Sequence, residues 1–163
     1  MKKILVFTHC YPRDERDSAG VFVKDWVEMV REGGYPVELF LCGGMSGELR
    51  SWWMVVKAAG MFPRYVWSGI RAARKADLLA AHWLFPSGVL AILAGGIRRK
   101  PVYLVLHGDP FLIERNRLVR FVARLVLRFA DCVQVVSTPC LKIVKKIYSG
   151  RTVMAPMPTK VIP

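Results

Sequence analysis

The chain has few acidic residues. Its 163 residues include 12 Asp and Glu against 25 Lys and Arg, which gives a formal net charge of +13. Hydrophobic residues make up 53% and charged residues 23%, a balance that excludes a disordered chain and predicts one globular domain spanning residues 1–163. The positive excess favours a negatively charged partner, and nucleic acid, anionic lipid and phosphorylated small molecules all stay open.

The sequence also lacks several motifs that mark metal, nucleotide and hydrolase sites. Its four cysteines form no Cys-x-x-Cys pair and do not cluster with histidine, so we expect no metal, and free thiols in a reducing compartment. Neither Gly-x-Gly-x-x-Gly nor the Walker motif occurs, and there is no nucleophile elbow. The apolar run 4–7 is too short for a secretory signal, so a cytoplasmic location is expected.

One long stretch, residues 78–97, carries no formal charge. Its length would suit a membrane span, but Pro86, Ser87 and Gly88 interrupt it in the middle. We interpret it as a buried strand followed by a buried helix, with a true span as the alternative.

Short apolar runs alternate with helix-like segments from end to end. We expect strands at 3–8, 37–41, 78–81, 102–106, 132–136 and 152–155, and helices at 19–32, 49–75 (broken at Pro63), 87–97, 115–129 and 139–148. Continuous apolar runs are typical of strands that are buried on both faces. The pattern therefore predicts an α/β fold, with a doubly wound, mostly parallel, Rossmann-like sheet.

Two histidines stand where strands end. His82 and His107 each follow an apolar run, and ligands of parallel sheets bind outside the carboxyl ends of the strands. His107 can donate a hydrogen bond or move a proton near neutral pH, and Gly108 would let a ligand approach the backbone. A histidine that is merely satisfied at a strand end is the alternative. For His82 we favour a structural role, enclosed by Trp83 and Leu84.

The loop after the first expected strand contains Gly20, with Ser18 as the expected cap of the following helix. A helix N-terminus offers free N–H groups and the positive end of a dipole, which suits a phosphate. A simple turn requirement for the glycine is the alternative.

Two segments are basic and amphipathic. Segment 115–129 sets four arginines beside an apolar face, and we expect that face to cover the sheet, with a solvated basic flank. Segment 49–75 mixes tryptophan with cations, which is typical of a helix on an anionic membrane, although a helix that covers the sheet fits equally well. The candidate membrane contacts are Trp52, Trp53, Lys57, Arg64, Trp67 and Arg71.

Three sequence patterns together resemble one protein family. They are the opening KILVFTHCYPRDERDSAGVFVKDWVEMVREGGYPVELF, then AHWLFPSG with a later Lys-Pro and an apolar strand into His-Gly, and ADCVQVVSTPCLKIV. These resemble the N-terminal, acceptor-side domain of GT-B retaining glycosyltransferases of family 4 (glycosyl transferase group 1), over nearly the whole chain. The resemblance implies metal-independent transfer of a sugar, of the hexosyltransferase type. The donor would be a nucleotide-sugar and the acceptor a lipid or polysaccharide, often at the inner membrane face.

The resemblance also implies roles by position. Gly20 matches the glycine whose backbone lies near the donor diphosphate, His107 matches the catalytic histidine that contacts the transferred sugar, and Gly108 belongs to the same donor site. Asp109 departs from the family's His-Gly-[Ser/Thr]-Asp, because the acid comes one residue early. Further candidates for substrate contact are His82, Asp109 and Ser137.

The family's second Rossmann-like domain has no counterpart in the sequence. That domain carries Glu-x7-Glu and most donor contacts, and the family's Pro-Asn-Gly-Val-Asp is replaced here by PMPTK. We therefore expect a half-enzyme, inactive unless a partner chain supplies the donor-binding domain, or a truncated relative. The alternative is a non-catalytic basic module that binds an anionic membrane or nucleic acid. Nucleic acid ranks last, because strands buried on both faces offer no platform for bases.

Overall fold

The computed structural model describes residues 2–14, 17–42 and 52–158, and of residues 52–59 the backbone alone. Within these ranges six strands form one parallel sheet in the order β2-β1-β3-β4-β5-β6. The strands are β1 (Ile4–Thr8), β2 (Val37–Leu41), β3 (Leu78–His82), β4 (Val102–Leu106), β5 (Cys132–Val135) and β6 (Thr152–Met154). The expected doubly wound, Rossmann-like parallel sheet is confirmed.

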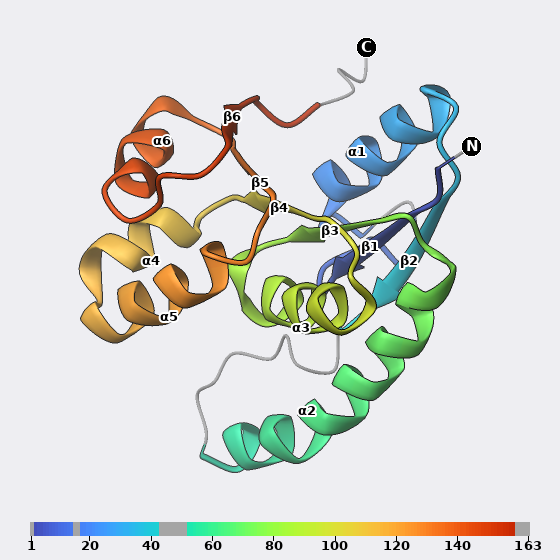
Figure 1. The fold of residues 1–163 in the computed structure, drawn as a ribbon, viewed down its shortest axis with the longest axis horizontal. Coiled ribbons are helices and arrows are strands. Elements are labelled where there is room, and N and C mark those ends of the chain that lie inside the picture. Colours follow the sequence, from blue (N-terminus) through green and yellow to red (C-terminus); the bar gives the residue numbers. More distant parts are fainter. Residues whose placement is uncertain (1, 15–16, 43–51, 159–163) are drawn as a thin grey trace.

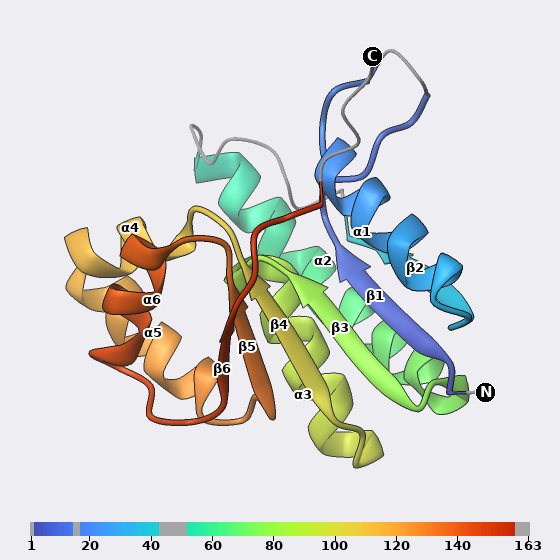
Figure 2. The same cartoon turned by 90° about the horizontal axis from the view of Figure 1, so that it is seen from above.

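The helices cover the two faces unequally (Figures 1 and 2). They are α1 (Val21–Glu32), α2 (Trp52–Ala72), α3 (Val89–Arg98), α4 (Asp109–Arg115), α5 (Arg117–Leu127) and α6 (Thr138–Lys145). Helix α1 packs on one face, whereas α2, α3 and α5 lie on the other, with α4 beside α5 and α6 beside α4. The reversal of strand order at β1 and β3 sends the right-handed crossovers to opposite faces.

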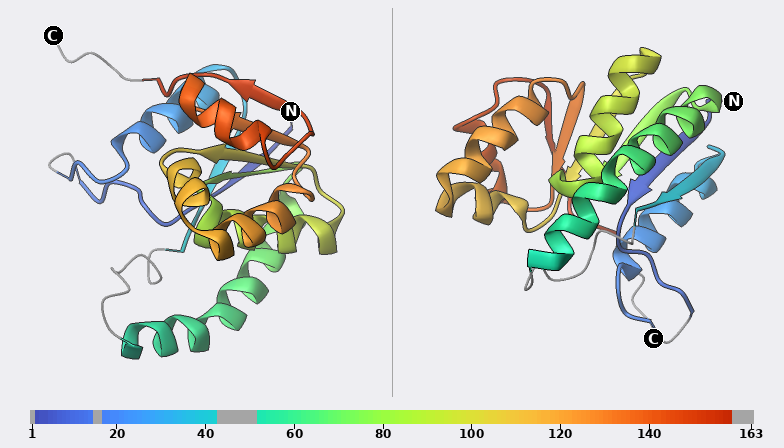
Figure 3. Two further views of the ribbon diagram at one scale, coloured as in Figure 1. Left: turned by 90° about the vertical axis from the view of Figure 1, so that its left-hand side faces the viewer. Right: turned by 90° about the horizontal axis from the view of Figure 1, so that it is seen from below.

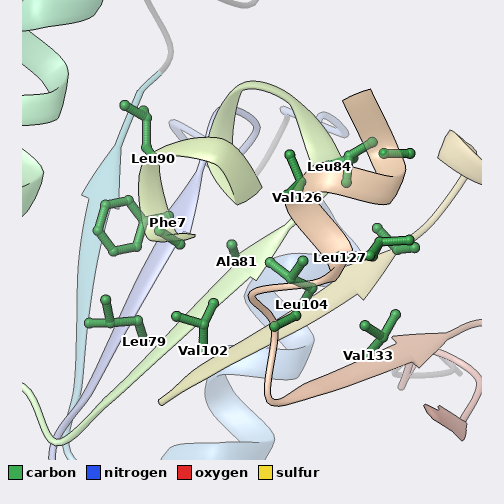
Figure 4. Packing of buried hydrophobic residues seen from close by; sticks show 14 of the residues in the cluster. Phe7, Leu79, Ala81, Leu84, Leu90, Val102, Leu104, Val126, Leu127 and Val133 are labelled. Carbon is green, nitrogen blue, oxygen red and sulfur yellow. The ribbon is translucent and has the colours of Figure 1, made fainter. Parts of the chain in front are cut away.

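Successive residues of a strand point to opposite faces of the sheet, so they contribute to two separate hydrophobic clusters. Leu79 and Ala81 of β3 belong to the larger cluster under α2, α3 and α5, and Ala80 between them belongs to the cluster under α1. Figure 4 shows the larger cluster, with Leu104 of β4 and Leu127 of α5 among its members. Burial on both faces explains why these strands have continuous apolar runs.

The uncharged stretch 78–97 forms β3, a π-helical turn (Leu84–Gly88) and most of α3, as expected for a buried strand and helix. In the part of the chain that the structure describes, no helix is both long and apolar enough to cross a bilayer. All four cysteines are free.

Three local predictions are wrong. Ser18 does not cap α1, because the cap is Gly20, in a left-handed conformation with φ 77°. Pro63 does not break α2, where it is exposed, so water can hydrate the carbonyl that its missing N–H leaves without a donor. Segment 115–129 forms one helix, α5, but it starts later than expected. Arg115 ends a separate helix, α4, that the sequence did not predict, and the Asn116 side chain accepts hydrogen bonds from the N–H groups of Leu118 and Val119 and caps α5. Expected helix residues 49–51 lie outside the described residues.

The orientation of α5 corrects a fourth expectation. The apolar residues that were expected to cover the sheet are exposed: Leu118, Phe121, Val122, Leu125 and Phe129. The helix instead buries Ala123, Val126 and Leu127. These three residues form a second apolar stripe on the helix, and this stripe faces the core.

Candidate functional site

All three histidines of the chain gather at the carboxyl edge of the sheet. His9 follows β1, His82 ends β3 and His107 follows β4, three strands that are neighbours in the sheet. The Trp83 ring joins them, with its centroid 4.5 Å from that of His9 and 4.7 Å from that of His107. Sequence reasoning missed His9, although its signal was the same as for the other two, a histidine directly after a buried strand.

His82 and His107 form a hydrogen-bonded pair. Nδ1 of His82 lies 3.1 Å from Nε2 of His107, and the rings stack with centroids 5.3 Å apart. His82 is fully buried, so it reaches a ligand only through His107. Burial, and then His107, lowers the pKa of His82 to about 3, and burial, and then His9, lowers the pKa of His107 to about 4. Both imidazoles are therefore neutral near pH 7.

The surroundings of His82 decide which ring donates. If His107 donated through Nε2, His82 would carry its proton on Nε2, which is buried and has no hydrogen-bond partner among the described residues. If His82 donates through Nδ1, its Nε2 carries only a lone pair without a partner. A buried N–H group without a partner is rarer in proteins than a buried acceptor without one. We therefore assign the donor role to His82. His107 then carries its proton on Nδ1, and this partly exposed ring offers an N–H donor at the rim.

The Asp109 carboxylate connects two segments of the rim by hydrogen bonds to their backbone. One carboxylate oxygen accepts from the N–H of Leu84 at 3.0 Å, and the other accepts from the N–H of His107 at 3.3 Å. Burial raises the pKa of Asp109, against the opposing effect of these hydrogen bonds. The carboxylate thus joins the turn after β3 to the end of β4, with both oxygens directed at backbone.

Gly20 brings the start of α1 against the rim. Its φ of +77° and the 2.5 Å distance from an added Cβ to the carbonyl oxygen of Cys10 both require glycine. Phe22, in the first turn, has its ring centroid 4.8 Å from that of His107 and 5.5 Å from that of Trp83. The close packing accounts for the glycine, and the helix N-terminus beside the histidines provides N–H groups that can meet an anion. Figure 2 shows α1 and α4 both starting near this edge of the sheet.

Two further candidates, Gly108 and Ser137, lie at or near the rim. Gly108 is exposed at the rim with φ −88°, and an added Cβ would meet nothing within 4 Å, so the space beside it is open. The Ser137 hydroxyl accepts a hydrogen bond from the N–H of Cys140 at 3.4 Å and caps α6. The thiol of Cys140 in turn points to the carbonyl of His107, so Ser137 lies near the rim, with its oxygen already engaged.

The candidate membrane contacts lie elsewhere. Arg64, Trp67 and Arg71 are exposed on α2. Trp67 and Arg71 line a basic depression together with residues of the short 3-10 turn Ala73–Lys75, which precedes the amino end of β3. This is the opposite edge of the sheet from the histidines. The side chains of Trp52, Trp53 and Lys57 lie outside the described residues.

The fold is a Rossmann-like α/β domain, and its candidate ligand site is the histidine rim at the carboxyl edge of the sheet. No group of His, Cys, Asp or Glu in the described ranges could hold a metal ion. No family model and no curated protein sequence matches the chain.

Among solved structures, the chain is similar to the crystal structure of Anabaena Alr3699/HepE in complex with UDP and glucose. The TM-score is 0.64 with 19% sequence identity, and the match covers 98% of this chain and 45% of that one. The chain thus spans less than half the length of that protein. At this identity the likeness shows a shared fold.

Proposed function

We propose that the histidine rim binds the sugar end of a nucleotide-sugar, and that the chain is the acceptor-side half of a glycosyltransferase. The observation that carries the proposal is the neutral His107 donor beside the N-terminus of α1, at the edge where such sheets bind ligands. The similar structure was crystallised with UDP and glucose, the two parts of a nucleotide-sugar. The family resemblance of the sequence points to the same chemistry.

The two groups suit the two parts of such a donor. A neutral imidazole N–H pairs with a hydroxyl oxygen of a sugar, and a pKa of about 4 keeps His107 in that form near pH 7. The N-terminus of α1 carries about half a positive charge, which would stabilise a departing diphosphate. In the transfer, the bond from the anomeric carbon to the diphosphate oxygen breaks and a bond to the acceptor oxygen forms. The acceptor proton leaves with the phosphate.

The finer parts of the proposal rest on the resemblance. They are retention of anomeric configuration, a lipid-linked or polysaccharide acceptor, and a donor-binding domain supplied by a partner chain. A cytoplasmic location at the inner membrane face belongs with them. The net charge of +13 is compatible with both a phosphorylated donor and an anionic surface.

Imidazole NMR tests the rim directly, because the chain has three histidines and hence three sets of ring nitrogen signals. Before any ligand is added, we expect His107 to report a proton on Nδ1. Adding UDP-glucose should shift the His107 signals in a saturable way, and glucose or UDP alone should shift them less. Unchanged signals up to about 10 mM UDP-glucose, well above a millimolar dissociation constant, would reject the site.

Turnover tests the assignment of His107. Sugar transfer is measured with and without a candidate donor-binding partner chain, and we expect activity only with it. His107→Ala should lower kcat by at least about a hundredfold, which is the usual range for a polarising group. The matched control is Met29→Ala on the outward side of α1, which should leave turnover unchanged. Full activity of His107→Ala would contradict its role.

The alternative, a basic module without catalysis, makes a different prediction. Binding to a phosphate backbone weakens steeply with salt, so filter binding to nucleic acid at rising salt distinguishes it. We expect no retention of nucleic acid at physiological salt, and tight, salt-sensitive binding would favour the module.

A further inference from the structure

Helix α5 presents large apolar side chains to solvent. Leu118, Phe121 and Leu125 are 71%, 60% and 47% exposed, and Phe129 just beyond the helix is 65% exposed. The helix meets the core with its opposite stripe. Aromatic and leucine side chains in a row are an unusual surface for a soluble domain, and they mark an interaction site.

The apolar surface continues onto α3. Leu93 and Ile97 are 38% and 61% exposed, and a shallow groove of about 350 Å³ between α3 and Phe129 is lined by these residues. We name this surface the α3–α5 face and define it by Leu93, Ile97, Leu118, Val122, Leu125 and Phe129. Figure 3 (right) shows α2, α3 and α5 in one layer on this side of the molecule.

Cations border the face on both sides. Arg117, Arg124 and Arg128 are exposed and recur at helical spacing, so they form a row along one edge of the apolar stripe. Lys100 lines the groove itself, and beyond it lies the basic depression that contains Trp67. Neither α3 nor α5 contains an acidic residue. Residues 49–163 hold 19 of the 25 basic residues but only 4 of the 12 acidic ones.

We infer that the α3–α5 face docks on an anionic lipid bilayer, with α5 lying in the plane of the interface. Its apolar side chains would enter the boundary between head groups and acyl chains, and the arginine row would meet anionic head groups. The proposed function already includes a location at the inner membrane face, and this inference adds the surface that makes the contact. It does not depend on the transfer reaction, since lipid binding requires no nucleotide-sugar.

Charge and position argue against two other partners for this face, a second copy of the chain and a donor-binding domain. A second copy that paired the same faces would bring together two surfaces that are each bordered by cations and hold no acidic residue on α3 or α5, in a chain of net charge +13. A donor-binding domain would have to face the histidine rim. Helix α5 instead runs from α4, at the rim, toward the amino end of β5. A bilayer offers both an apolar depth and a negative surface.

Vesicle co-sedimentation of the full chain tests the inference. The vesicles are phosphatidylcholine with 30% phosphatidylglycerol, and pure phosphatidylcholine serves as the uncharged reference. We expect binding to the anionic vesicles, with Leu118→Ser/Leu125→Ser weakening it at least tenfold. Arg124→Gln/Arg128→Gln should weaken it about fivefold for each charge removed. The matched controls are Met29→Ser, 46% exposed on α1, and Lys2→Gln/Lys24→Gln, and both should bind like the unaltered chain.

Each outcome decides the inference. Substitution of exposed side chains leaves the fold intact, and circular dichroism of each variant checks this. Equal binding of Leu118→Ser/Leu125→Ser and Met29→Ser would overturn the inference. So would binding of the unaltered chain that disappears completely at high salt, if the leucine variant shows the same salt dependence, because the contact would then be purely electrostatic. So would concentration-dependent self-association that the leucine variant abolishes, because the face would then be an interface between copies. Vesicle binding by a chain that transfers no sugar in the presence of the partner chain would reject the proposed function and leave this inference standing.

Discussion

Replacing Gly20 with alanine should be the most damaging single-methyl change at the rim. The left-handed φ of +77° costs an L-residue about 1–2 kcal/mol. The added Cβ would also lie 2.5 Å from the carbonyl oxygen and 2.7 Å from the carbonyl carbon of Cys10, both backbone atoms, so the loop must move. Such overpacking adds about 1–3 kcal/mol. The sum of about 3 kcal/mol corresponds to a fall in Tm of about 6–12 °C for a chain of this length.

Two other glycines separate the contributions. Gly34 has φ +84° but open space around its Cβ position, so Gly34→Ala should cost only the conformational part, about 1–2 kcal/mol. Gly108 has φ −88° and open space, so Gly108→Ala should change stability by less than about 0.5 kcal/mol. Thermal and urea unfolding of the three variants measures the order. If Gly20→Ala lost no more stability than Gly34→Ala, the close approach of the loop to α1 would be refuted.

Three further predictions follow from the same geometry. Asp109→Ala removes the acceptor of two backbone N–H groups and should lower the free energy of unfolding by about 1–3 kcal/mol. Asp109→Asn should be intermediate in stability. Equal stability of the unaltered chain and both variants in urea unfolding would contradict the role of these hydrogen bonds. Burial lowers the pKa of His82 to about 3 and of His107 to about 4, so between the ordinary value of 6.5 and these values the unfolded chain binds more protons and stability falls as pH falls. Urea unfolding of His82→Phe across this range should show a weaker fall, and an unchanged slope would count against the buried neutral pair. Gly95→Ala would bring a Cβ within 2.4 Å of a Val102 methyl and should destabilise the chain, whereas Gly95→Ala/Val102→Ala should recover part of the loss, a coupling that a double-mutant cycle measures.

Much of the architecture can be predicted from the sequence. Short apolar runs such as Val102–Leu106 alternate with helix-like segments, and a sheet that is covered on both faces buries most residues of such runs. Because the carboxyl ends of parallel strands meet at one edge, His82 and His107 could be expected on the same rim. The uncharged stretch 78–97 could be divided correctly, since its central Pro-Ser-Gly turn separates a strand from a helix.

Only the tertiary structure decided how the rim works. The hydrogen bond between His82 and His107 joins residues 25 positions apart, and the contact of His9 with Ser87 joins residues 78 apart. Local periodicity carries no information on such distances. The direction of proton donation likewise depends on what surrounds Nε2 of His82, which is a property of the packed core.

The same limit applies to α5. Its sequence has an apolar stripe that contains Leu118 and Leu125 and a second one that contains Ala123 and Leu127, so periodicity alone fits either orientation. Packing against the sheet selected the stripe with the small alanine and left the larger side chains exposed. The sequence by itself determined that this helix is amphipathic and basic. Which apolar stripe meets the core, and hence which one is available to a membrane, was decided by the shape of the surface beneath it.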